Sequence, residues 1–110
     1  MEKNAKEIQS LCRQIVENFS PQKIILFGSH AYGKPMTDSD VDLLVVMPFE
    51  CRSVDQAIKI RQRIFPKMPL DLLARTPAQI EERLNSGDIF IKEIIECGKI
   101  LYESENAGMD

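Results

Sequence analysis

Apolar residues recur every three or four positions between residues 3 and 19, the spacing that places side chains on one face of a helix. These residues are Ile8, Leu11, Cys12, Ile15, Val16 and Phe19. Ser20 and Pro21 come next, and a helix rarely continues through proline because the ring removes a backbone N–H. The pattern therefore predicts an amphipathic helix that ends near Phe19 and packs one face against a core.

Three further segments are short, apolar and rich in branched residues, which is typical of buried strands. They are Lys23–Phe27, Val41–Met47 and Leu70–Ala74. Gly28 and Ser29 end the first of these strands, and we expect a loop or a short helical turn from there to Pro35. Pro48 closes the second strand.

A helix is expected between the second and third strands. Ser53 and Gln56 have the spacing of a capping box, in which each side chain bonds to the other residue's backbone. The apolar stripe predicted for this helix consists of Val54, Ala57, Ile58, Ile64 and Phe65. Pro66 and Pro69 end the helix before the third strand begins.

Two more helices are expected after the third strand. Thr76 and Gln79 repeat the capping-box spacing, with Pro77 at the first helical position, so one helix runs over about residues 76–85. Asp88 predicts the start of a last helix, which ends at Cys97 before Gly98. Both helices follow the strands closely, so we expect them to pack on the sheet.

The predicted order is helix, strand, strand, helix, strand, helix, helix. Residues 99–102 add either a short final strand or a helical turn. This order predicts a mixed α+β class with a small mixed sheet of three to four strands and helices packed on it. The chain has 110 residues, which suits a single domain spanning residues 1–110.

Composition narrows the class of function. Apolar residues make up 44% of the chain and charged residues 28%, which is ordinary for a soluble globular protein. The net charge of −3 argues against general affinity for nucleic acid, which needs a basic face. The three cysteines form no metal-binding or disulfide pattern. No segment has the length of a membrane span or the apolar core of a signal peptide, so we expect a cytoplasmic protein without membrane contact.

Three aspartates lie at strand positions where a carboxylate needs a partner. Asp40 and Asp42 project from the same face of the second strand, roughly 6–7 Å apart. Asp71 lies inside the third strand, and it meets them if these two strands are neighbours. Like charges at this distance raise a pKa or recruit a cation. Three such acids can hold two metal ions about 4 Å apart, as in phosphoryl transfer.

Structural explanations for the same residues stay open. Residues 38–40 can form a polar turn before a strand, and Asp42 can cap that strand at the surface. Asp71 can face solvent from an edge strand. A glycine such as Gly28 permits close backbone approach, and Ser29 can begin a helical turn that binds phosphate. A Gly-Ser pair after a strand is usually only a turn, so it is evidence for a phosphate site only through its distance from Asp40.

Together these motifs resemble the nucleotidyltransferase superfamily that includes DNA polymerase β. The segments GSHAYG and DSDVDLLV are close to those of its smallest members, the minimal nucleotidyltransferases. The resemblance is close over residues 24–75, and the preceding helix and the KILYE ending also resemble the elements that flank these motifs in the family. The resemblance implies a nucleotidyltransferase-like fold.

The resemblance also implies roles for five residues. Gly28 and Ser29 would hold the β and γ phosphates of a nucleoside triphosphate. Asp40 and Asp42 would bind two Mg²⁺ ions. Asp71 would bind the catalytic Mg²⁺ and help to take the proton from the attacking hydroxyl. The products would be a nucleotidylated acceptor and pyrophosphate.

Partners follow from the same resemblance. Minimal nucleotidyltransferases are commonly encoded beside a small helical HEPN-type protein, in a pair that resembles a toxin–antitoxin module. The chain would then be the antitoxin, an enzyme that moves AMP from ATP to a hydroxyl of its partner, a tyrosine for example. The alternatives are a binding module that neutralises the partner by contact alone, and a transferase that acts on a small molecule.

Other residues leave two interpretations open. His30 and Lys34 can contact a phosphate or face solvent. The last predicted helix has an apolar face wider than one stripe needs, formed by Ile89, Phe90, Ile91, Ile94 and Ile95. This face is either core or, where it stays exposed, an interface with a partner chain or with a second copy.

Overall fold

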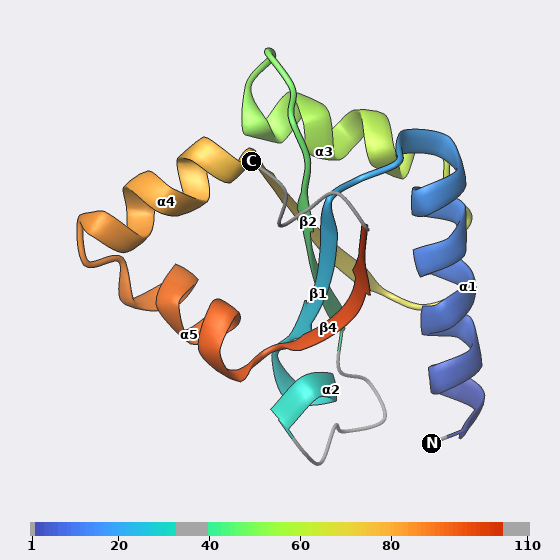
Figure 1. Cartoon of the computed structure of the whole chain (residues 1–110). Helices are drawn as coiled ribbons and strands as arrows, with labels where there is room; N and C mark the ends of the chain where they lie inside the picture. Colours follow the sequence, from blue (N-terminus) through green and yellow to red (C-terminus); the bar gives the residue numbers. More distant parts are fainter. Residues whose placement is uncertain (1, 33–39, 105–110) are drawn as a thin grey trace.

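The structure is a computed structural model that describes residues 2–32 and 40–104 (Figure 1). Within these residues the elements are α1 (Glu2–Phe19), β1 (Lys23–Phe27), α2 (Ser29–Tyr32), β2 (Val41–Val46), α3 (Ser53–Arg61), β3 (Leu70–Arg75), α4 (Pro77–Asn85), α5 (Ile89–Cys97) and β4 (Lys99–Glu103). The α+β class predicted from the sequence is confirmed. The segment after Gly98, which the sequence left open, is a strand. None of the described helices is long and apolar enough to span a membrane.

The sheet has four strands in the order β3-β2-β1-β4. Strand β1 is antiparallel to both β2 and β4, whereas β2 and β3 are parallel. Parallel neighbours need a crossover connection, and α3 lies in the connection between β2 and β3. Because β2 and β3 run the same way, their first residues lie at the same end of the sheet. The register pairs Asp42 with Asp71.

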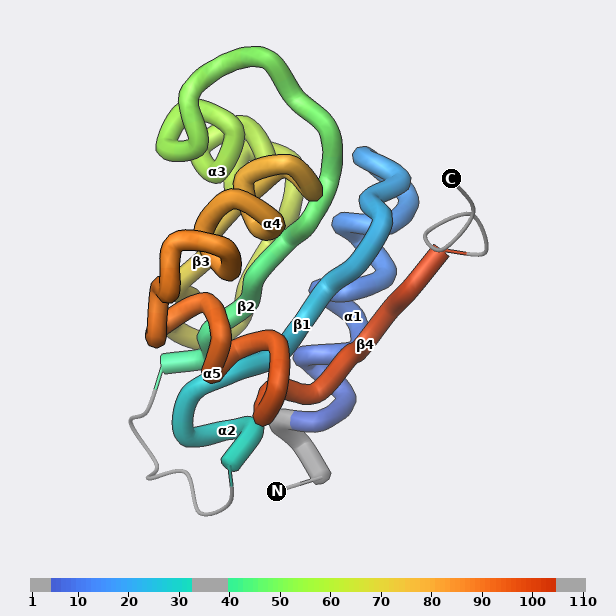
Figure 2. Tube along the Cα trace, turned by 60° about the vertical axis from the view of Figure 1, so that its left-hand side comes forward, coloured from blue at the N-terminus to red at the C-terminus, as the bar shows by residue number. Residues whose placement is uncertain are grey.

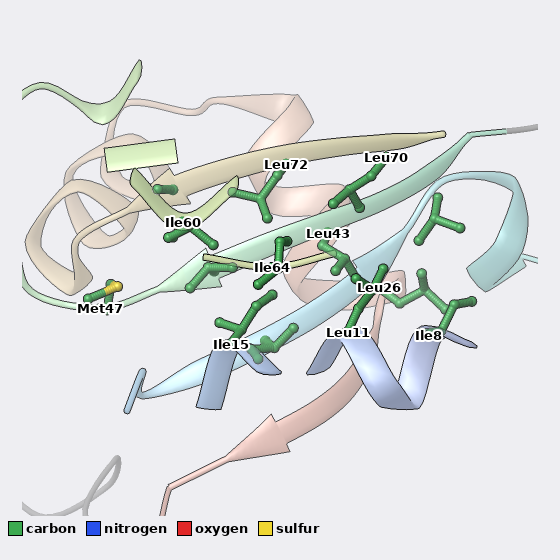
Figure 3. Close-up of a cluster of buried hydrophobic side chains, with 14 residues drawn as sticks. Ile8, Leu11, Ile15, Leu26, Leu43, Met47, Ile60, Ile64, Leu70 and Leu72 are labelled. Atoms are coloured by element: carbon green, nitrogen blue, oxygen red, sulfur yellow. The ribbon is translucent and has the colours of Figure 1, made fainter. Parts of the chain in front are cut away.

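Helices cover both faces of the sheet (Figure 1). Side chains alternate between the two faces of a strand, so each strand supplies two cores. The larger core lies under α1 and α3 (Figure 3), and its buried residues are Ile8, Leu11, Ile15, Ile24, Leu26, Val41, Leu43, Val45, Met47, Ile60, Ile64, Leu70, Leu72 and Ala74. The smaller core lies under α5, with Ile80 of α4 packed against it, and contains Ile25, Phe27, Leu44, Val46, Ile91 and Ile94.

The side of α3 that faces the core differs from the sequence prediction. Val54, Ile58 and Phe65 of the predicted stripe are exposed. The buried positions are Gln56 and Ile60, one helical turn apart on α3, and Ile64, which lies just after the helix ends at Arg61. The predicted stripe is right at Ile64 and at Ala57, which packs against the core, and it is wrong where it left out the buried Gln56 and Ile60.

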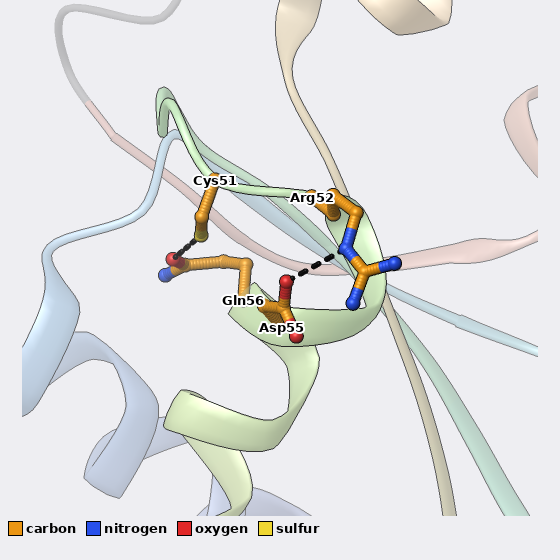
Figure 4. Close-up of polar contacts among 4 residues, drawn as sticks. All are labelled: Cys51, Arg52, Asp55 and Gln56. Carbon is orange, nitrogen blue, oxygen red and sulfur yellow. Dashed lines mark hydrogen bonds and ion pairs between the residues drawn. The ribbon is translucent and has the colours of Figure 1, made fainter.

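The start of α3 shows how a polar residue is accommodated inside. The helix begins after Arg52 without a side-chain cap, so the predicted capping box at Ser53 does not form. Gln56 turns inward instead, where its Oε1 accepts a hydrogen bond from the Cys51 thiol at 3.4 Å (Figure 4). Its Nε2 lies 3.5 Å from the sulfur of Met47. Arg52 and Asp55 form an exposed ion pair at 2.9 Å (Figure 4). The contacts with Cys51 and Met47 supply polar partners for the buried amide of Gln56, so its burial is tolerated.

The caps of α4 and α5 confirm the sequence prediction. Thr76 Oγ1 accepts a hydrogen bond from the Gln79 backbone N–H at 3.0 Å, and Gln79 Oε1 accepts one from the Thr76 backbone N–H at 2.9 Å. Asp88 Oδ1 accepts a hydrogen bond from the Ile91 backbone N–H at 3.1 Å. These bonds satisfy N–H groups that would otherwise lack partners at the helix ends. The caps therefore fix the residues at which α4 and α5 begin.

Candidate active site

Three strand ends meet at one end of the sheet. Strand β1 ends there with Phe27, and β2 and β3 begin there with Val41 and Leu70. Phe27 pairs with Asp42, and Asp42 pairs with Asp71, so the three residues form a row across the sheet. Helix α2 follows β1 at the same end, next to α5 (Figure 2). Because paired residues point to the same face, both carboxylates lie on the face that α4 and α5 cover.

Asp42 combines partial burial with a raised pKa. It is half-buried, whereas Asp40 and Asp71 are exposed. Burial raises the pKa of Asp42, and the negative charges of Asp71 and Asp40 and a side-chain hydrogen bond with Asp71 raise it further. The positive charge of His30 acts in the opposite direction. Ionisation of Asp42 is therefore unfavourable in this position unless a cation binds to the cluster.

Gly28 lets the chain approach this carboxylate closely. Its φ of +75° is the left-handed conformation that glycine adopts readily. A Cβ atom placed on Gly28 would lie 2.1 Å from Asp42 Oδ2, which is far inside van der Waals contact. The Gly28 carbonyl accepts hydrogen bonds from the N–H groups of Ala31 at 3.0 Å and Tyr32 at 3.1 Å, which closes the turn of α2. A glycine is therefore needed here for two independent reasons.

The positive charge of His30 offsets the negative charge around Asp42 only in part, because the pKa of Asp42 is still raised. Three ion pairs between described residues lie away from these carboxylates and join Lys23 to Glu103, Arg52 to Asp55 and Arg83 to Asp88. Carboxylate oxygens are the ligands that Mg²⁺ prefers, so the chemistry of the donors fits this ion. Among the described residues, however, no three His, Cys, Asp or Glu side chains are already arranged around a metal position. The metal-binding roles of the three aspartates therefore stay a prediction.

The remaining predicted residues lie around the same end of the sheet or outside the described ranges. Ser29 is exposed at the start of α2, and His30 is half-buried beside it. Lys34 lies outside the described residues. The roles predicted for Gly28 and Ser29 with phosphate likewise stay a prediction.

Two aromatic residues near the aspartates were not predicted as part of the site. Tyr32 is half-exposed on α2, and its pKa is raised by partial burial and by the nearby charges of Glu93, Cys97 and Asp42. Phe90 of α5 packs edge-to-face on Phe27, with ring centroids 5.8 Å apart and an interplanar angle of 84°. The sequence marked Phe90 only as part of a wide apolar face, because nothing local indicated that β1 brings Phe27 beneath it.

Comparisons with known proteins identify the family. The model of the family described as polymerase beta, nucleotidyltransferase matches residues 6–107, which is most of the chain. The chain belongs to this nucleotidyltransferase family, and the resemblance drawn from its motifs is confirmed. None of the curated proteins compared with the sequence matches it.

Solved structures share the fold at low sequence identity. A candidate nucleotidyltransferase from Sulfolobus solfataricus is 17% identical, with a TM-score of 0.60 over 91% of this chain and 80% of that one. A chain of a mutant MntA–HpeT toxin–antitoxin complex is also 17% identical, with a TM-score of 0.55 over 89% of this chain and 75% of that one. At this identity the two likenesses establish the shared fold.

Proposed function

We propose that the protein is a Mg²⁺-dependent nucleotidyltransferase that transfers AMP from ATP to a hydroxyl of a partner protein. One observation carries the proposal: the parallel register of β2 and β3 sets Asp42 beside Asp71, next to the close approach of Gly28. Membership of the nucleotidyltransferase family supports the reaction class. The acceptor and the nucleotide are the parts that the proposal adds.

Asp40, Asp42 and Asp71 would hold two Mg²⁺ ions. Such ions, when bound, neutralise charge on the phosphates and favour the attacking and leaving oxygens of an in-line displacement. The raised pKa of Asp42 supports this assignment, because a bound cation would offset the charge that burial and the neighbouring carboxylates disfavour. The protein would therefore bind Mg²⁺ more tightly when all three carboxylates are ionised.

The chain's own residues would then position the reactants. Gly28 and Ser29 would receive the β and γ phosphates, since the glycine backbone can be approached closely and the serine is exposed. Asp71 is exposed and would accept the proton from the attacking hydroxyl. A bond would form between that oxygen and the α phosphorus, the bond from the α phosphorus to the bridging oxygen would break, and pyrophosphate would leave.

We propose a small helical HEPN-type protein as the partner, with the present chain as its antitoxin. The support is the resemblance to minimal nucleotidyltransferases and the fold shared with a chain of a toxin–antitoxin complex. In this pairing the acceptor hydroxyl belongs to the partner, and attachment of AMP would inactivate it.

Labelled ATP tests the proposal directly. The full chain is incubated with Mg²⁺, ATP labelled on the α phosphate and a HEPN-type protein, and the mass and label of that protein are measured. Asp40→Asn and Asp42→Asn should abolish labelling, whereas Asp55→Asn, a change at an exposed ion pair on α3, should leave it intact. Mg²⁺ should also raise the melting temperature of the wild type and not of Asp42→Asn. Equal labelling by the wild type and both site variants would refute the proposal, and partner neutralisation without any label would favour action by contact.

A further inference from the structure

The tip of the α4–α5 hairpin exposes three large apolar side chains. Leu84 is 38% exposed, Ile89 81% and Phe90 51%, and we call these three residues the apolar tip. Ile91 and Ile94, from the same predicted face of α5, are buried against the sheet. The sequence left open whether this face was core or interface, and the structure divides it between the two. Exposed apolar side chains grouped in this way are typical of interaction sites.

The apolar tip adjoins the candidate active site. Phe90 rests on Phe27, and Phe27 is the cross-strand neighbour of Asp42 on the same face of the sheet. One turn further along α5, the charge of Glu93 reaches Tyr32 on α2. A molecule that covers the tip would therefore lie beside the three aspartates. Phe65 provides a contrast, because it is 78% exposed but its backbone N–H donates to Gln14 of α1, which covers the opposite face.

The charges around the tip are mostly negative. Residues 77–97 contain five acidic residues and two basic ones, and one of the basic residues, Arg83, is already paired with Asp88 at 3.8 Å. Glu81 lies one helical turn before Leu84, and Glu93 lies one turn after Phe90. Lys92 lies one turn after Ile89, so the rim carries one positive charge among an excess of negative ones. An acidic rim attracts a cationic partner and does nothing to recruit an uncharged nucleobase.

We infer that the apolar tip and its acidic rim bind the acceptor protein, through a segment that carries an apolar side chain and Lys or Arg close to the acceptor hydroxyl. This inference rests on the proposed function for the identity of the acceptor, but binding can be measured without transfer. The tip supplies the apolar contact, Glu81 and Glu93 select the positive charge, and the position of Phe90 beside Asp42's cross-strand neighbour delivers the hydroxyl to the aspartates.

Synthetic peptides provide the probe. The first contains one tyrosine flanked by leucine and two lysines, the second replaces the lysines with glutamates, and the third replaces the leucine with serine. Binding of each fluorescein-labelled peptide to the full chain is measured by anisotropy, and transfer of labelled AMP is measured in parallel. We expect the first peptide to bind at least about ten-fold more tightly than the others, since both burial and charge contribute.

Matched variants locate the binding surface. Ile89→Ser removes the most exposed side chain of the tip and should weaken binding of the first peptide about ten-fold, with unchanged melting temperature. Phe65→Ser removes an equally exposed side chain on the other face and should change nothing. Glu93→Lys should reduce the preference for lysine over glutamate. The affinity for a fluorescent ATP analogue should be the same in all three variants.

The outcomes separate this inference from the proposed function. Selective binding of the first peptide without AMP transfer would support the docking surface, and the transferase would then be judged by labelling of the partner protein. Transfer to all three peptides alike, unaffected by Ile89→Ser, would keep the transferase and overturn the docking surface. Failure of any peptide to bind the wild type selectively overturns it as well. A loss of ATP affinity in Ile89→Ser would also overturn the docking surface, because the apolar tip would then bind the nucleobase of ATP.

Discussion

Replacing Gly28 with alanine tests the central geometry of the site most directly. The structure gives this glycine two separate roles, a left-handed φ of +75° and a close approach to Asp42. Alanine in the left-handed region costs about 1–2 kcal/mol. For a chain of this size that lowers the melting temperature by about 5–15 °C. This part of the effect is a property of the backbone and would occur at any similar glycine.

The second part of the effect belongs to the site alone. The new Cβ would lie 2.1 Å from Asp42 Oδ2, so the carboxylate has to move by roughly 1 Å to reach a normal contact. A misplacement of about 1 Å at a reacting centre typically costs about 10²-fold in rate. We therefore expect Gly28→Ala to lose about 10²-fold in AMP transfer, beyond any loss of folded protein.

Gly87 supplies the matched control. Its φ is +81°, but nothing lies within 4 Å of the position that a Cβ would take. Gly87→Ala should therefore destabilise the fold by a similar amount, while its Mg²⁺-dependent ATP affinity stays that of the wild type. Thermal melts, ATP binding and transfer rates are compared for both variants at a temperature where each is folded. If Gly28→Ala retains wild-type transfer, the contact between Gly28 and Asp42 has no part in catalysis and the assignment of the site is wrong.

Two further predictions concern stability. Asp42→Asn should raise the melting temperature at pH 7 without Mg²⁺, because the folded state binds the Asp42 proton more tightly than the unfolded chain does, so ionisation opposes folding. The difference in melting temperature between Asp42→Asn and the wild type should shrink as the pH falls through the raised pKa, and it should vanish below the ordinary value of 3.8. A difference that grows in acid would contradict the direction of the pKa shift. Thr76→Ala should cost about 1 kcal/mol in urea unfolding because the α4 capping box is lost, and Thr76→Ser should restore most of it. Equal stability of the two Thr76 variants would show that the cap contributes nothing.

Local patterns predicted most of the elements because the forces that form them are local. The helical spacing of residues 3–19, the branched apolar strands and the caps at Thr76 and Asp88 all appear in the structure at or near the expected positions. The prediction failed at α3, where Gln56 is buried. Its partners Cys51 and Met47 come from the segment that links β2 to α3. No periodicity rule applied to α3 alone could have shown that they would satisfy the amide.

The sequence by itself determined which residues are candidates for the chemistry: three aspartates in or beside short apolar strands, and a glycine that directly follows another such strand. Only the tertiary structure decided that they meet. The parallel pairing of β2 with β3 aligns Asp71 with Asp42, although 28 residues separate them in the chain. Packing of α5 on β1 likewise decided that Ile91 and Ile94 are buried while Ile89 and Phe90 stay exposed. The physical reason is that strand register and helix docking depend on contacts between distant segments, which are set when the two cores form.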